Sequence, residues 1–487
     1  MPDHLYRFRS LDALLGVRQE LDRGEIYFAA PEQLNDPMEG YLDVVWRGDA
    51  ILWRNLLRHY ALCLLHAGSL ALLTPDMDEA FLRDMGRRSA QDIADIPLAA
   101  LHAELCRDLL ESPVAAKLLD HLARLERSVS REELLFYLST LHPFVLACLL
   151  RLLVRRGLMP STAVLPTALL DPPHSEAERL LSRLASLGGE DEELIHAGFS
   201  AALSVATQIT LINDYQVHGA QQTESWKVVT RTFANHYVTS LEGLIYPQWR
   251  VACFGETADN ASMWGVYGDS HTGVCLKFKS RMADGFQGLR MNAHVGWGGG
   301  RDDEHRAIYG QRPFRFEPVR YDAVRPRLEF FLALGVLPRV KMNDWVLDEE
   351  GKPSPLVRPM FDETPVWREA YWRDYAAGFA VKTPEWAHER EYRLVMEGGL
   401  DHRKPHYLAT ATFAFEDLVG VIFGVRTPEA KKIEIMRIIE AKCRESGHRD
   451  FEFHQARYEG RGSKLIIAPL GLLKFDWTTS DQDHEHV

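Results

Sequence analysis

The sequence predicts an α+β fold with a mixed, mainly antiparallel β core that is formed by the N-terminal and C-terminal parts and carries a large all-α insertion. Three observations predict it: period-two alternation near the N-terminus, leucine-rich helical spacing from about residue 50 to 230, and strand-like segments after about residue 241. The N-terminal piece is too short to bury a core alone. Its strands therefore need partners from the C-terminal part, and we expect the helical block to lie between them as an insertion.

The first predicted strand lies close to the N-terminus, in the segment 1–48. Tyr6 and Phe8 alternate with Arg7 and Arg9, which is the period of a β-strand. Arg7 and Arg9 should then point to the same side, where their guanidinium groups could hold a phosphate or a carboxylate. The alternative is a pair of plain surface arginines.

The rest of this segment reads as helix, strand and turn. Ser10 is a typical N-cap for a helix that runs to about residue 21, and Gly24 is a typical residue for ending it. Residues 25–29 are rich in strand formers. Asn35-Asp36-Pro37 predicts a turn in which the Asn or Asp side chain accepts a hydrogen bond from its own backbone, although both side chains are also candidate ligand contacts.

Residues 49–235 are expected to form the all-helical insertion. Proline and glycine breaks divide the segment into roughly six to nine helices. The stretch 134–150 carries no formal charge and lies at the lower edge of the length that spans a membrane. Because Pro143 lies in its middle, we interpret it as a pair of buried helices broken at the proline. The insertion is also the expected surface for a protein partner.

Residues 236–475 are expected to form the main part of the α+β domain, followed by a disordered tail at 476–487. The stretch 291–312, rich in Gly, His and Arg, reads as a mobile loop. Helices are predicted near 325–334 and 366–379. The remaining predicted elements are strands at 250–254, 273–278, 391–396, 418–423 and 464–469, and helices at 262–267 and 428–446.

Composition narrows the classes of function. The chain has 487 residues and a formal net charge of −13 at pH 7, so a general electrostatic attachment to nucleic acid or to anionic lipid is not expected. Its six cysteines form no C-x-x-C pair, so neither a zinc ribbon nor a disulfide framework is indicated. The N-terminal residues run straight into the first predicted strand without a basic and apolar leader, so we expect a cytoplasmic protein that is not attached to a membrane.

Four sequence blocks stand out together. They are residues 5–10 (LYRFRS) with 26–28 (IYF) and 35–37 (NDP); 253–256 (CFGE) with 263–275 (MWGVYGDSHTGVC); Lys382 and Trp386 with 389–395 (EREYRLV); and 421–424 (VIFG). This set resembles a bacterial family, domain-of-unknown-function family 2971, over the N-terminal piece and most of 241–440. Gly255 replaces the family's usual serine and Gly268 its usual alanine. The resemblance implies no established activity, and the helical block lies outside it.

The E-x-E block offers paired carboxylates. On an extended strand Glu389, Glu391 and Arg393 would line one face, because alternate side chains share a face. The functional interpretation is a catalytic carboxylate pair in a cleft, which stabilises positive charge on a sugar or activates a nucleophile. Lys382 and Arg393 would then contact the ligand. The alternative is a ladder of charges that faces solvent.

Three aromatic residues are candidate contacts for a planar ring. Tyr27 lies on the second predicted strand, and Trp264 and Tyr267 lie three residues apart on one side of a short helix. The alternative for all three is a place in the core. His271 is a candidate polar contact to a ligand. The aspartate and serine before it supply the residue types of a hydrolytic triad, but adjacent residues rarely face one another. No metal site is predicted.

Together these residues suggest an enzyme that consumes NAD, either a glycohydrolase or an ADP-ribosyltransferase-like enzyme. The E-x-E spacing with an early arginine strand is loosely similar to ADP-ribosyltransferases. Arginine would hold the pyrophosphate, an aromatic ring would stack on the nicotinamide, and glutamate would bond the ribose hydroxyl as an oxocarbenium ion develops. NAD is then a substrate, and no tightly bound cofactor is expected. Such chemistry would suit a bacterial toxin or an antiviral-defence effector.

Two other hypotheses stay open. One is a non-catalytic module that senses a nucleotide or binds a protein. The other is a metal-dependent nuclease in which Asp36, Glu389 and Glu391 hold Mg²⁺ beside Lys382. The NAD hypothesis depends on the two ends of the chain meeting at one cavity, which Arg9 and Glu391 would line together.

Overall fold

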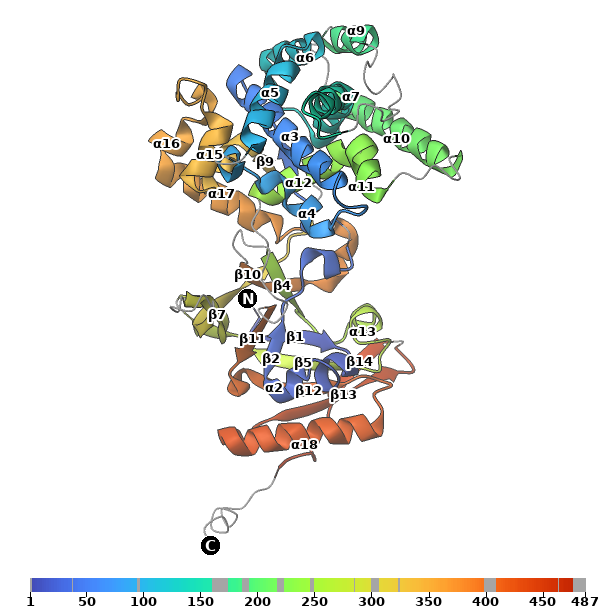
Figure 1. Ribbon diagram of the computed structural model, residues 1–487. Coiled ribbons are helices and arrows are strands. Elements are labelled where there is room, and N and C mark those ends of the chain that lie inside the picture. The colour runs from blue at the N-terminus through green and yellow to red at the C-terminus, as the bar shows by residue number, and fades with distance from the viewer. Residues whose placement is uncertain are drawn as a thin grey trace. The chain divides into compact units, whose positions relative to one another are not determined.

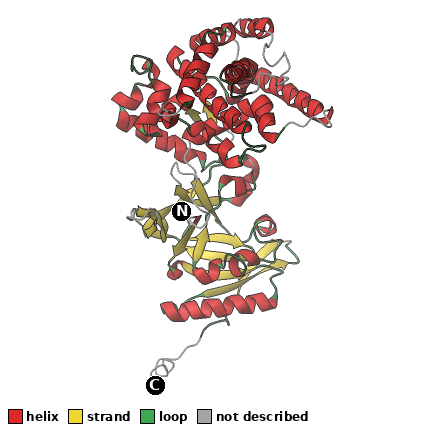
Figure 2. Cartoon of the chain, in the orientation of Figure 1, coloured by secondary structure: helices red, strands yellow, loops and turns green. Residues whose placement is uncertain are grey.

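The computed structural model describes residues 2–36, 38–93, 97–159, 174–185, 192–216, 223–245, 249–283, 285–298, 306–322, 325–397, 409–462 and 464–475 (Figure 1). The chain divides into two compact units. The β-rich unit consists of Met1–Tyr41, Gln248–Val324 and Phe379–Val487, and the helical unit consists of Leu42–Pro247 and Arg325–Gly378. Figure 2 shows that the strands gather in the first unit and most helices in the second.

The β-rich unit is built on a twelve-stranded sheet, which confirms the predicted α+β fold with a mixed, mainly antiparallel core. The strand order is β14-β13-β12-β5-β1-β4-β10-β8-β7-β11-β2, with β6 paired to β7. Among the described pairings of this sheet, β12 with β13 is the parallel one. The strands are β1 (His4–Arg9), β2 (Glu25–Tyr27), β4 (Trp249–Gly255), β5 (Val274–Lys279), β6 (Arg281–Ala283), β7 (Phe286–Gly298), β8 (Arg306–Pro318), β10 (Glu391–Glu397), β11 (Thr410–Phe413), β12 (Leu418–Phe423), β13 (Glu452–Glu459) and β14 (Lys464–Pro469).

The two faces of this sheet bury different apolar clusters. Helix α18 (Glu429–Ser446) contributes Ile435, Ile439 and Cys443 to the larger cluster, and their four-residue spacing places them on one side of the helix. On the other face, helix α13 (Ala261–Val266) packs the ring of Trp264 against Phe8 of β1. Because side chains alternate along β1, Arg7 lies on the opposite face of that strand from Phe8.

The stretch predicted as a mobile loop, 291–312, lies mostly in a hairpin of two long strands. β7 and β8 pair antiparallel over most of their length. Leu289, Met291 and Ala293 alternate into the core, whereas glycine, histidine and arginine occupy the intervening and terminal positions. The prediction was wrong because these polar and glycine residues hid the period-two pattern. Residues 299–305 lie outside the described residues.

The helix predicted after Ser10 is in fact two short helices, α1 (Leu11–Leu15) and α2 (Glu20–Arg23). Ser10 caps α1 as predicted, because its Oγ accepts a hydrogen bond from the Ala13 N–H at 3.2 Å. α1 ends early at Gly16, where a Cβ would lie 2.5 Å from the carbonyl oxygen of Asp12. Gly24 ends α2 with a left-handed φ of 64°, as predicted.

The helical unit has other boundaries than the predicted insertion, 49–235. It includes part of the segment predicted for the main α+β domain, 236–475, because β9 (Arg327–Glu329) pairs in parallel with β3 (Asp43–Val45). Neither three-residue strand is recognisable from its own sequence. The helices of this unit are α3 (Ala50–Ala71), α4 (Glu79–Asp84), α5 (Leu98–Leu110), α6 (Pro113–Arg124), α7 (Arg131–Arg155), α9 (His174–Ala185), α10 (Glu192–Gln216), α11 (Glu224–Lys227), α12 (Phe233–Ile245), α14 (Phe330–Ala333), α15 (Arg339–Val346), α16 (Pro359–Asp362) and α17 (Thr364–Gly378).

The uncharged stretch 134–150 lies within a single helix, α7, and not in a broken pair. α7 continues through Pro143 because the turns on both sides of it are buried, and this packing offsets the roughly 3 kcal/mol that an internal proline costs. Two described helices, α7 and α10, are long and apolar enough to cross a membrane by length and composition. For α7, 72% of the apolar window is buried inside the protein, as in a core helix, but for α10 only 6% is buried. The predicted disordered tail, 476–487, lies outside the described residues.

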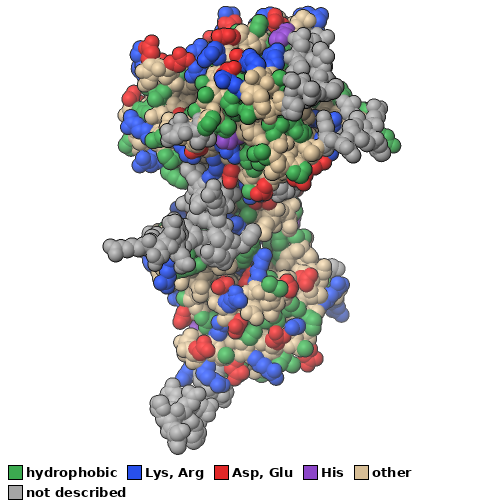
Figure 3. All heavy atoms as spheres, viewed as in Figure 1, with side chains coloured by type: hydrophobic (Ala, Val, Ile, Leu, Met, Phe, Trp, Pro, Cys, Tyr) green, Lys and Arg blue, Asp and Glu red, His purple; other side chains and the backbone are tan. Residues whose placement is uncertain are grey.

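Charged side chains of both signs are intermixed on the face of the molecule shown in Figure 3. Among the described residues of that face, neither sign covers a broad continuous area of either unit. A group of five ionisable side chains lies buried inside the β-rich unit, where the less polar surroundings strengthen the interactions between charges.

Candidate functional site

The β-rich unit contains a cavity of about 190 Å³ at the point where β1 and β4 separate. These strands share one register pair, Tyr6 opposite Gly255, and part beyond it. Because a cavity of about 150 Å³ holds a benzene ring, this one has room for about one ring-sized group. It is lined by eight residues that the sequence marked as candidates: Arg7, Arg9, Tyr27, Asn35, Tyr267, Lys382, Glu389 and Glu391. Arg9 and Glu391, on which the NAD hypothesis depends, therefore lie at one cavity.

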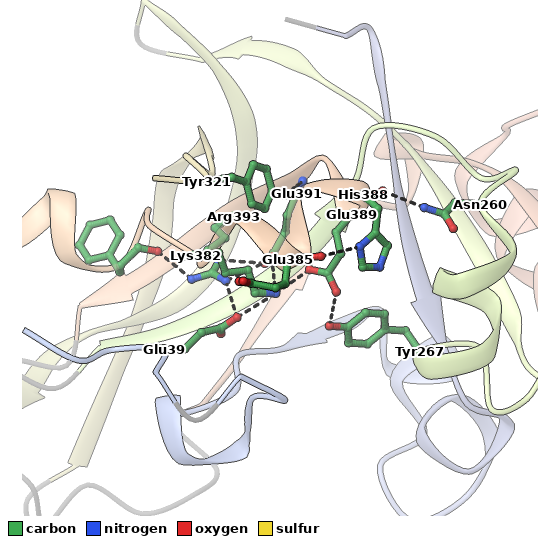
Figure 4. Close-up of polar contacts among 11 residues, drawn as sticks. Glu39, Asn260, Tyr267, Tyr321, Lys382, Glu385, His388, Glu389, Glu391 and Arg393 are labelled. Carbon is green, nitrogen blue, oxygen red and sulfur yellow. Dashed lines mark hydrogen bonds and ion pairs between the residues drawn. The ribbon is translucent and has the colours of Figure 1, made fainter. Parts of the chain in front are cut away.

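Five buried ionisable residues form the charged cluster at this cavity (Figure 4): Glu39, Lys382, Glu389, Glu391 and Arg393. The Nζ atom of Lys382 lies at its centre. It is 2.8 Å from Oε1 of Glu39, 2.5 Å from Oε2 of Glu389 and 2.9 Å from Oε2 of Glu391. Each of the five residues is at most 6% exposed. At this depth, removal of one charged partner leaves the others buried and uncompensated.

Arg393 holds Glu391 from the side away from the cavity. Its Nε donates to Oε1 of Glu391 at 2.8 Å and its Nη2 donates to Oε2 at 3.1 Å, a bidentate pair. Its Nη1 donates to the carbonyl oxygen of Phe379 at 2.8 Å. Arg393 is fully buried and does not line the cavity, whereas we had predicted a ligand contact for it. Its hydrogen bonds hold the Glu391 carboxylate in position.

Arg390 turns the chain between the two glutamates of the E-x-E block. The 3₁₀ helix η7 (Pro384–Glu389) ends at the first glutamate, and β10 begins at the second. The prediction that both glutamates lie on one strand was therefore wrong. Arg390 has a φ of 45°, in the left-handed region that non-glycine residues rarely adopt. The N–H of Glu391 donates to Oη of Tyr321 at 2.7 Å and holds the start of the strand. The turn directs both carboxylates at the same ammonium group.

The carboxylates of the cluster differ in ionisation. Burial opposes ionisation of Glu391, but Arg393 and Lys382 outweigh burial and lower the pKa of Glu391 to about 2. Burial raises the pKa of Glu39 above its ordinary value. Neither oxygen of Glu39 accepts a hydrogen bond of good geometry from the described residues, although Oε1 lies within ion-pair distance of both cations. Three carboxylates thus face two cations, which leaves room for one more positive charge, either a proton on Glu39 or a cationic ligand.

The two predicted anion-binding arginines already have partners in the protein. Nη2 of Arg7 donates to the carbonyl oxygen of Tyr27 at 2.7 Å, and its Nη1 donates to that of Cys253 at 3.3 Å. Burial lowers the pKa of Arg7 to about 10. Arg9 forms a two-fold ion pair with Glu20, in which its Nε donates to Oε2 at 2.8 Å. Both arginines point the same way, as predicted. The hydrogen bonds of Arg7, however, connect β1 with β2 and β4, and the carboxylate of Glu20 balances the charge of Arg9.

Two of the three predicted aromatic residues line the cavity. Tyr267 donates its hydroxyl hydrogen to Oε1 of Glu389 at 2.7 Å, and burial raises the pKa of this tyrosine, so the hydroxyl keeps its proton. The hydroxyl of Tyr27 donates to Oε1 of Gln33 at 2.8 Å, and one face of its ring is covered by the guanidinium of Arg18. Trp264 is a core residue with no exposed surface, so the structural alternative holds for it.

The remaining candidates lie elsewhere in the β-rich unit. Asp36 forms the predicted turn, because its Oδ1 accepts a hydrogen bond from the Met38 N–H at 2.8 Å, and it does not line the cavity. Asn35 does line the cavity. His271 does not line it and has a left-handed φ of 70°, as do the two residues before it at 51° and 52°. The run around His271 is therefore a tight turn and not a contact surface for this cavity.

Sequence reasoning missed Glu39, the third carboxylate of the cluster. It lies two residues after the N-D-P turn, and no spacing rule connects it with Lys382, which is hundreds of residues further along the chain. Cys253, which lines the cavity, was noted only as part of the 253–256 block and not as a site residue, and Tyr321, which holds the strand start, was missed. An acidic residue that follows a turn directly is a weak signal of such a site.

Comparison with known proteins returned no relative. No family model, no curated protein and no solved structure matched the chain. The resemblance to domain-of-unknown-function family 2971 therefore remains a prediction. The function has to be argued from the residues of the cavity and their chemistry.

Proposed function

We propose that the β-rich unit is an NAD-consuming enzyme that breaks the bond between nicotinamide and ribose, as a glycohydrolase or an ADP-ribosyltransferase-like enzyme. The observation that carries the proposal is the convergence of Glu389 and Glu391 on one ammonium group at the wall of a ring-sized cavity. This chemistry needs a ribosyl or nicotinamide ring to be held next to carboxylates in fixed positions.

The charge and size of the cavity support a refined version of the sequence hypothesis. The cavity takes about one ring, so a dinucleotide would place only its nicotinamide–ribose end inside. Nicotinamide in NAD⁺ carries a positive charge, which suits a cluster with one carboxylate more than it has cations. Arg7 and Arg9 have partners in the protein, so the pyrophosphate would remain outside and would not be held by them, contrary to the sequence hypothesis.

The residues then have distinct parts in the reaction. When the bond between ribose and nicotinamide breaks, its electron pair stays on the ring nitrogen and neutral nicotinamide leaves. The ribosyl oxocarbenium ion that remains is stabilised by Glu391, which Arg393 and Lys382 keep ionised, and by Glu389. Water, or the hydroxyl of an acceptor, adds to the ribosyl carbon and releases its proton to solvent. Lys382 and Arg393 are positioning residues.

One specific observation favours a second candidate, a non-catalytic module that binds a nucleoside-like cation. Glu391 already accepts hydrogen bonds on both oxygens, and Glu389 already accepts from Lys382 and Tyr267. Such a closed network would bind a ligand without turning it over. The nuclease hypothesis has less support, because the carboxylates converge on the Lys382 ammonium, which stands where a metal would be shared.

The test is release of nicotinamide. The full chain is incubated with NAD⁺, and nicotinamide is measured by chromatography for the wild type and for Glu391→Gln. We expect the substitution to reduce release at least about 100-fold, since it removes a charge that stabilises the transition state. Glu133→Gln is the matched control, because Glu133 is equally buried and pairs with Arg127 in the helical unit. If the folded wild type binds NAD⁺ in calorimetry but releases no nicotinamide, the result favours the non-catalytic module. A bacterial toxin or defence role, and the cytoplasmic location, remain predictions.

A further inference from the structure

The helical unit contains a cavity of its own, with a volume of about 720 Å³. Most of its lining comes from four helices, of which α6 packs against α9 and α7 packs against α10 (Figure 1). Pockets that hold small organic ligands usually measure about 300–1,000 Å³ and are lined mostly by apolar and aromatic side chains. This cavity, which we call the helical-unit cavity, is therefore large enough for a molecule of several rings.

Three aromatic rings form one wall of the helical-unit cavity. The ring of Phe199 from α10 lies with its centroid 5.2 Å from that of Phe136 and 5.6 Å from that of Tyr137, both on α7. The rings meet edge to face. Leu181 of α9 and Ile195 of α10 add aliphatic surface to the lining. A planar apolar molecule finds favourable ring contacts on such a wall.

His121 of α6 also lines the cavity, and the hydrogen bonds around it fix which ring nitrogen carries the proton. Its Nε2 lies 2.8 Å from Oη of Tyr137. The hydroxyl of Tyr137 donates to Oε1 of Glu133 at 2.7 Å, and Arg127 pairs with both oxygens of that carboxylate. Because an ionised carboxylate only accepts hydrogen bonds, the tyrosine hydrogen is used there. Nε2 of His121 must therefore carry a hydrogen and donate it to Tyr137.

The other ring nitrogen of His121, Nδ1, is left as an acceptor without a donor. Burial lowers the pKa of His121, so the ring is neutral at neutral pH and Nδ1 keeps its lone pair. The residue is only 9% exposed, yet no described residue donates to Nδ1. Nor is Nδ1 among the partnerless side-chain atoms that the fold seals off completely, so a ligand can reach it. The cavity wall thus offers one hydrogen-bond acceptor.

The charged side chains at the helical-unit cavity are already balanced. Each of the three cations that line it has a carboxylate partner: Lys117 with Glu178 at 2.8 Å, Arg124 with Asp120 at 2.7 Å, and Arg127 with Glu133 at 2.6 Å. A charged ligand would have to break one of these pairs or lose its water without compensation. The lining therefore favours a neutral ligand.

We propose that the helical-unit cavity binds a neutral aromatic molecule of two or more rings that carries a hydroxyl or N–H group. The volume of the cavity sets the size of the ligand, and the aromatic wall selects its rings. Nδ1 of His121 accepts the hydrogen of the hydroxyl or N–H group and so orients the molecule. The site belongs to the helical unit and does not depend on the NAD chemistry proposed for the β-rich unit.

The first test measures which ligand features the wild type selects. The full chain is titrated with N-phenyl-1-naphthylamine, a neutral aromatic amine whose fluorescence rises in apolar surroundings, and we expect saturable binding. Three competitors of similar size then displace the probe. We expect 2-naphthol to bind about 3- to 10-fold more tightly than 2-methoxynaphthalene, which lacks the donor, because that is the usual effect of one neutral hydrogen bond. The anion 2-naphthoate should bind at least about 10-fold more weakly than 2-naphthol.

Three variants locate the site, and circular dichroism checks that each of them folds. A Cβ at Gly198, which lines the cavity, would lie in open space, so Gly198→Trp can place its ring inside and should abolish saturable binding of the probe. Ala206→Trp is the matched control, because Ala206 is exposed on the same helix and does not line the cavity. It should bind like the wild type. His121→Phe keeps a ring but removes the acceptor, so 2-naphthol and 2-methoxynaphthalene should then bind equally well.

Several results would overturn the proposal. A wild type that shows no saturable binding of the probe has no such site, and one that binds 2-naphthoate most tightly has a site for anions. Equal binding by Gly198→Trp and Ala206→Trp would place the probe on the outer surface of α10. A preference for 2-naphthol that is absent from the wild type, or that persists in His121→Phe, would remove the role of His121. The competition experiment on the wild type does not depend on any variant being folded.

Discussion

Each unit buries a polar network, one around Lys382 and one around His142, and these two networks treat charge in opposite ways. The charged cluster of the β-rich unit keeps its charges, because Lys382 and Arg393 stand beside the carboxylates. The helical unit buries neutral histidines. Both ring nitrogens of His142 have partners, Oη of Tyr60 and the carbonyl oxygen of Val229, each at 2.8 Å, and burial lowers the pKa of His142 to about 4.

This difference separates a network that holds a fold from one that can act on a ligand. A neutral, fully paired histidine costs little to bury and produces little field. Buried charges cost much more, even when they are paired, and replacing them with apolar residues is often favourable. The presence of five buried charges around a cavity therefore suggests that their electric field acts on a ligand. This is the physical basis of the proposed function.

The largest expected effect breaks the charged cluster at its centre. Lys382→Met removes the ammonium that three carboxylates share, so we expect the free energy of unfolding to fall by about 3–5 kcal/mol. Urea unfolding followed by tryptophan fluorescence measures it. Lys117→Met is the control, because Lys117 makes one exposed ion pair with Glu178 and should change stability by less than about 1 kcal/mol. Equal losses in the two variants would show that the cluster is not strongly coupled.

The next largest expected effect is a difference between the two units in how their stability depends on pH. Burial lowers the pKa of His59 to about 3 and that of His142 to about 4, whereas the unfolded chain binds these protons near pH 6.5. The unfolded state thus binds more protons below pH 6.5, and stability should fall by about 2–3 kcal/mol per histidine as the pH drops to 4.5. The contribution of Glu391 is present above its ordinary pKa of 4.5 and is lost only between pH 4.5 and about 2.

Hydrogen exchange with mass spectrometry can follow the two units separately between pH 6.5 and 4.5. We expect amides of α3 and α7, which carry these histidines, to lose protection first, after correction for the intrinsic pH dependence of exchange. The strands β4 and β10 should keep theirs in this range. Earlier loss of protection in the strands would contradict the assignment of the two networks.

The smallest effect tests the neutral network directly. Tyr60→Phe leaves Nδ1 of His142 buried without its partner, so unfolding should become easier by about 1–2 kcal/mol, less than for Lys382→Met. Urea unfolding at neutral pH measures it. A loss as large as that at Lys382 would mean that the neutral network is as strongly coupled as the charged one.

Local patterns predicted much of the β-rich unit. Strands β1, β4, β5 and β12 each contain a short run of alternating or apolar residues, and the Ser10 cap and the Asp36 turn follow from single side chains. The hairpin of β7 and β8 was missed because its exposed positions resemble a loop. The pairing of β3 with β9 depends on two short segments far apart in the chain, which no local rule connects.

The candidate site was predicted by residue type more than by geometry. Lys382, Glu389 and Glu391 do meet at one cavity. Their types predict this, because an ionisable side chain is buried in a fold only next to groups that compensate its charge. The partners themselves depend on the tertiary fold. Whether Arg7 holds a ligand or two carbonyl oxygens depends on where β1 separates from β4, and Glu39 joins the cluster only because its turn lies beside β10.

β1 leaves the ribosome before any of its neighbours in the sheet exist. β4 and β5 follow only after Leu42–Pro247 has been made, which takes about 10 to 40 seconds at the usual rates of synthesis. During that time β1 and β2 are unpaired edges, open to chaperones and to wrong partners. Lys382 and β10 arrive later still, so a ribosome that stalls before them would release a chain in which many helices are complete and the cavity has never formed.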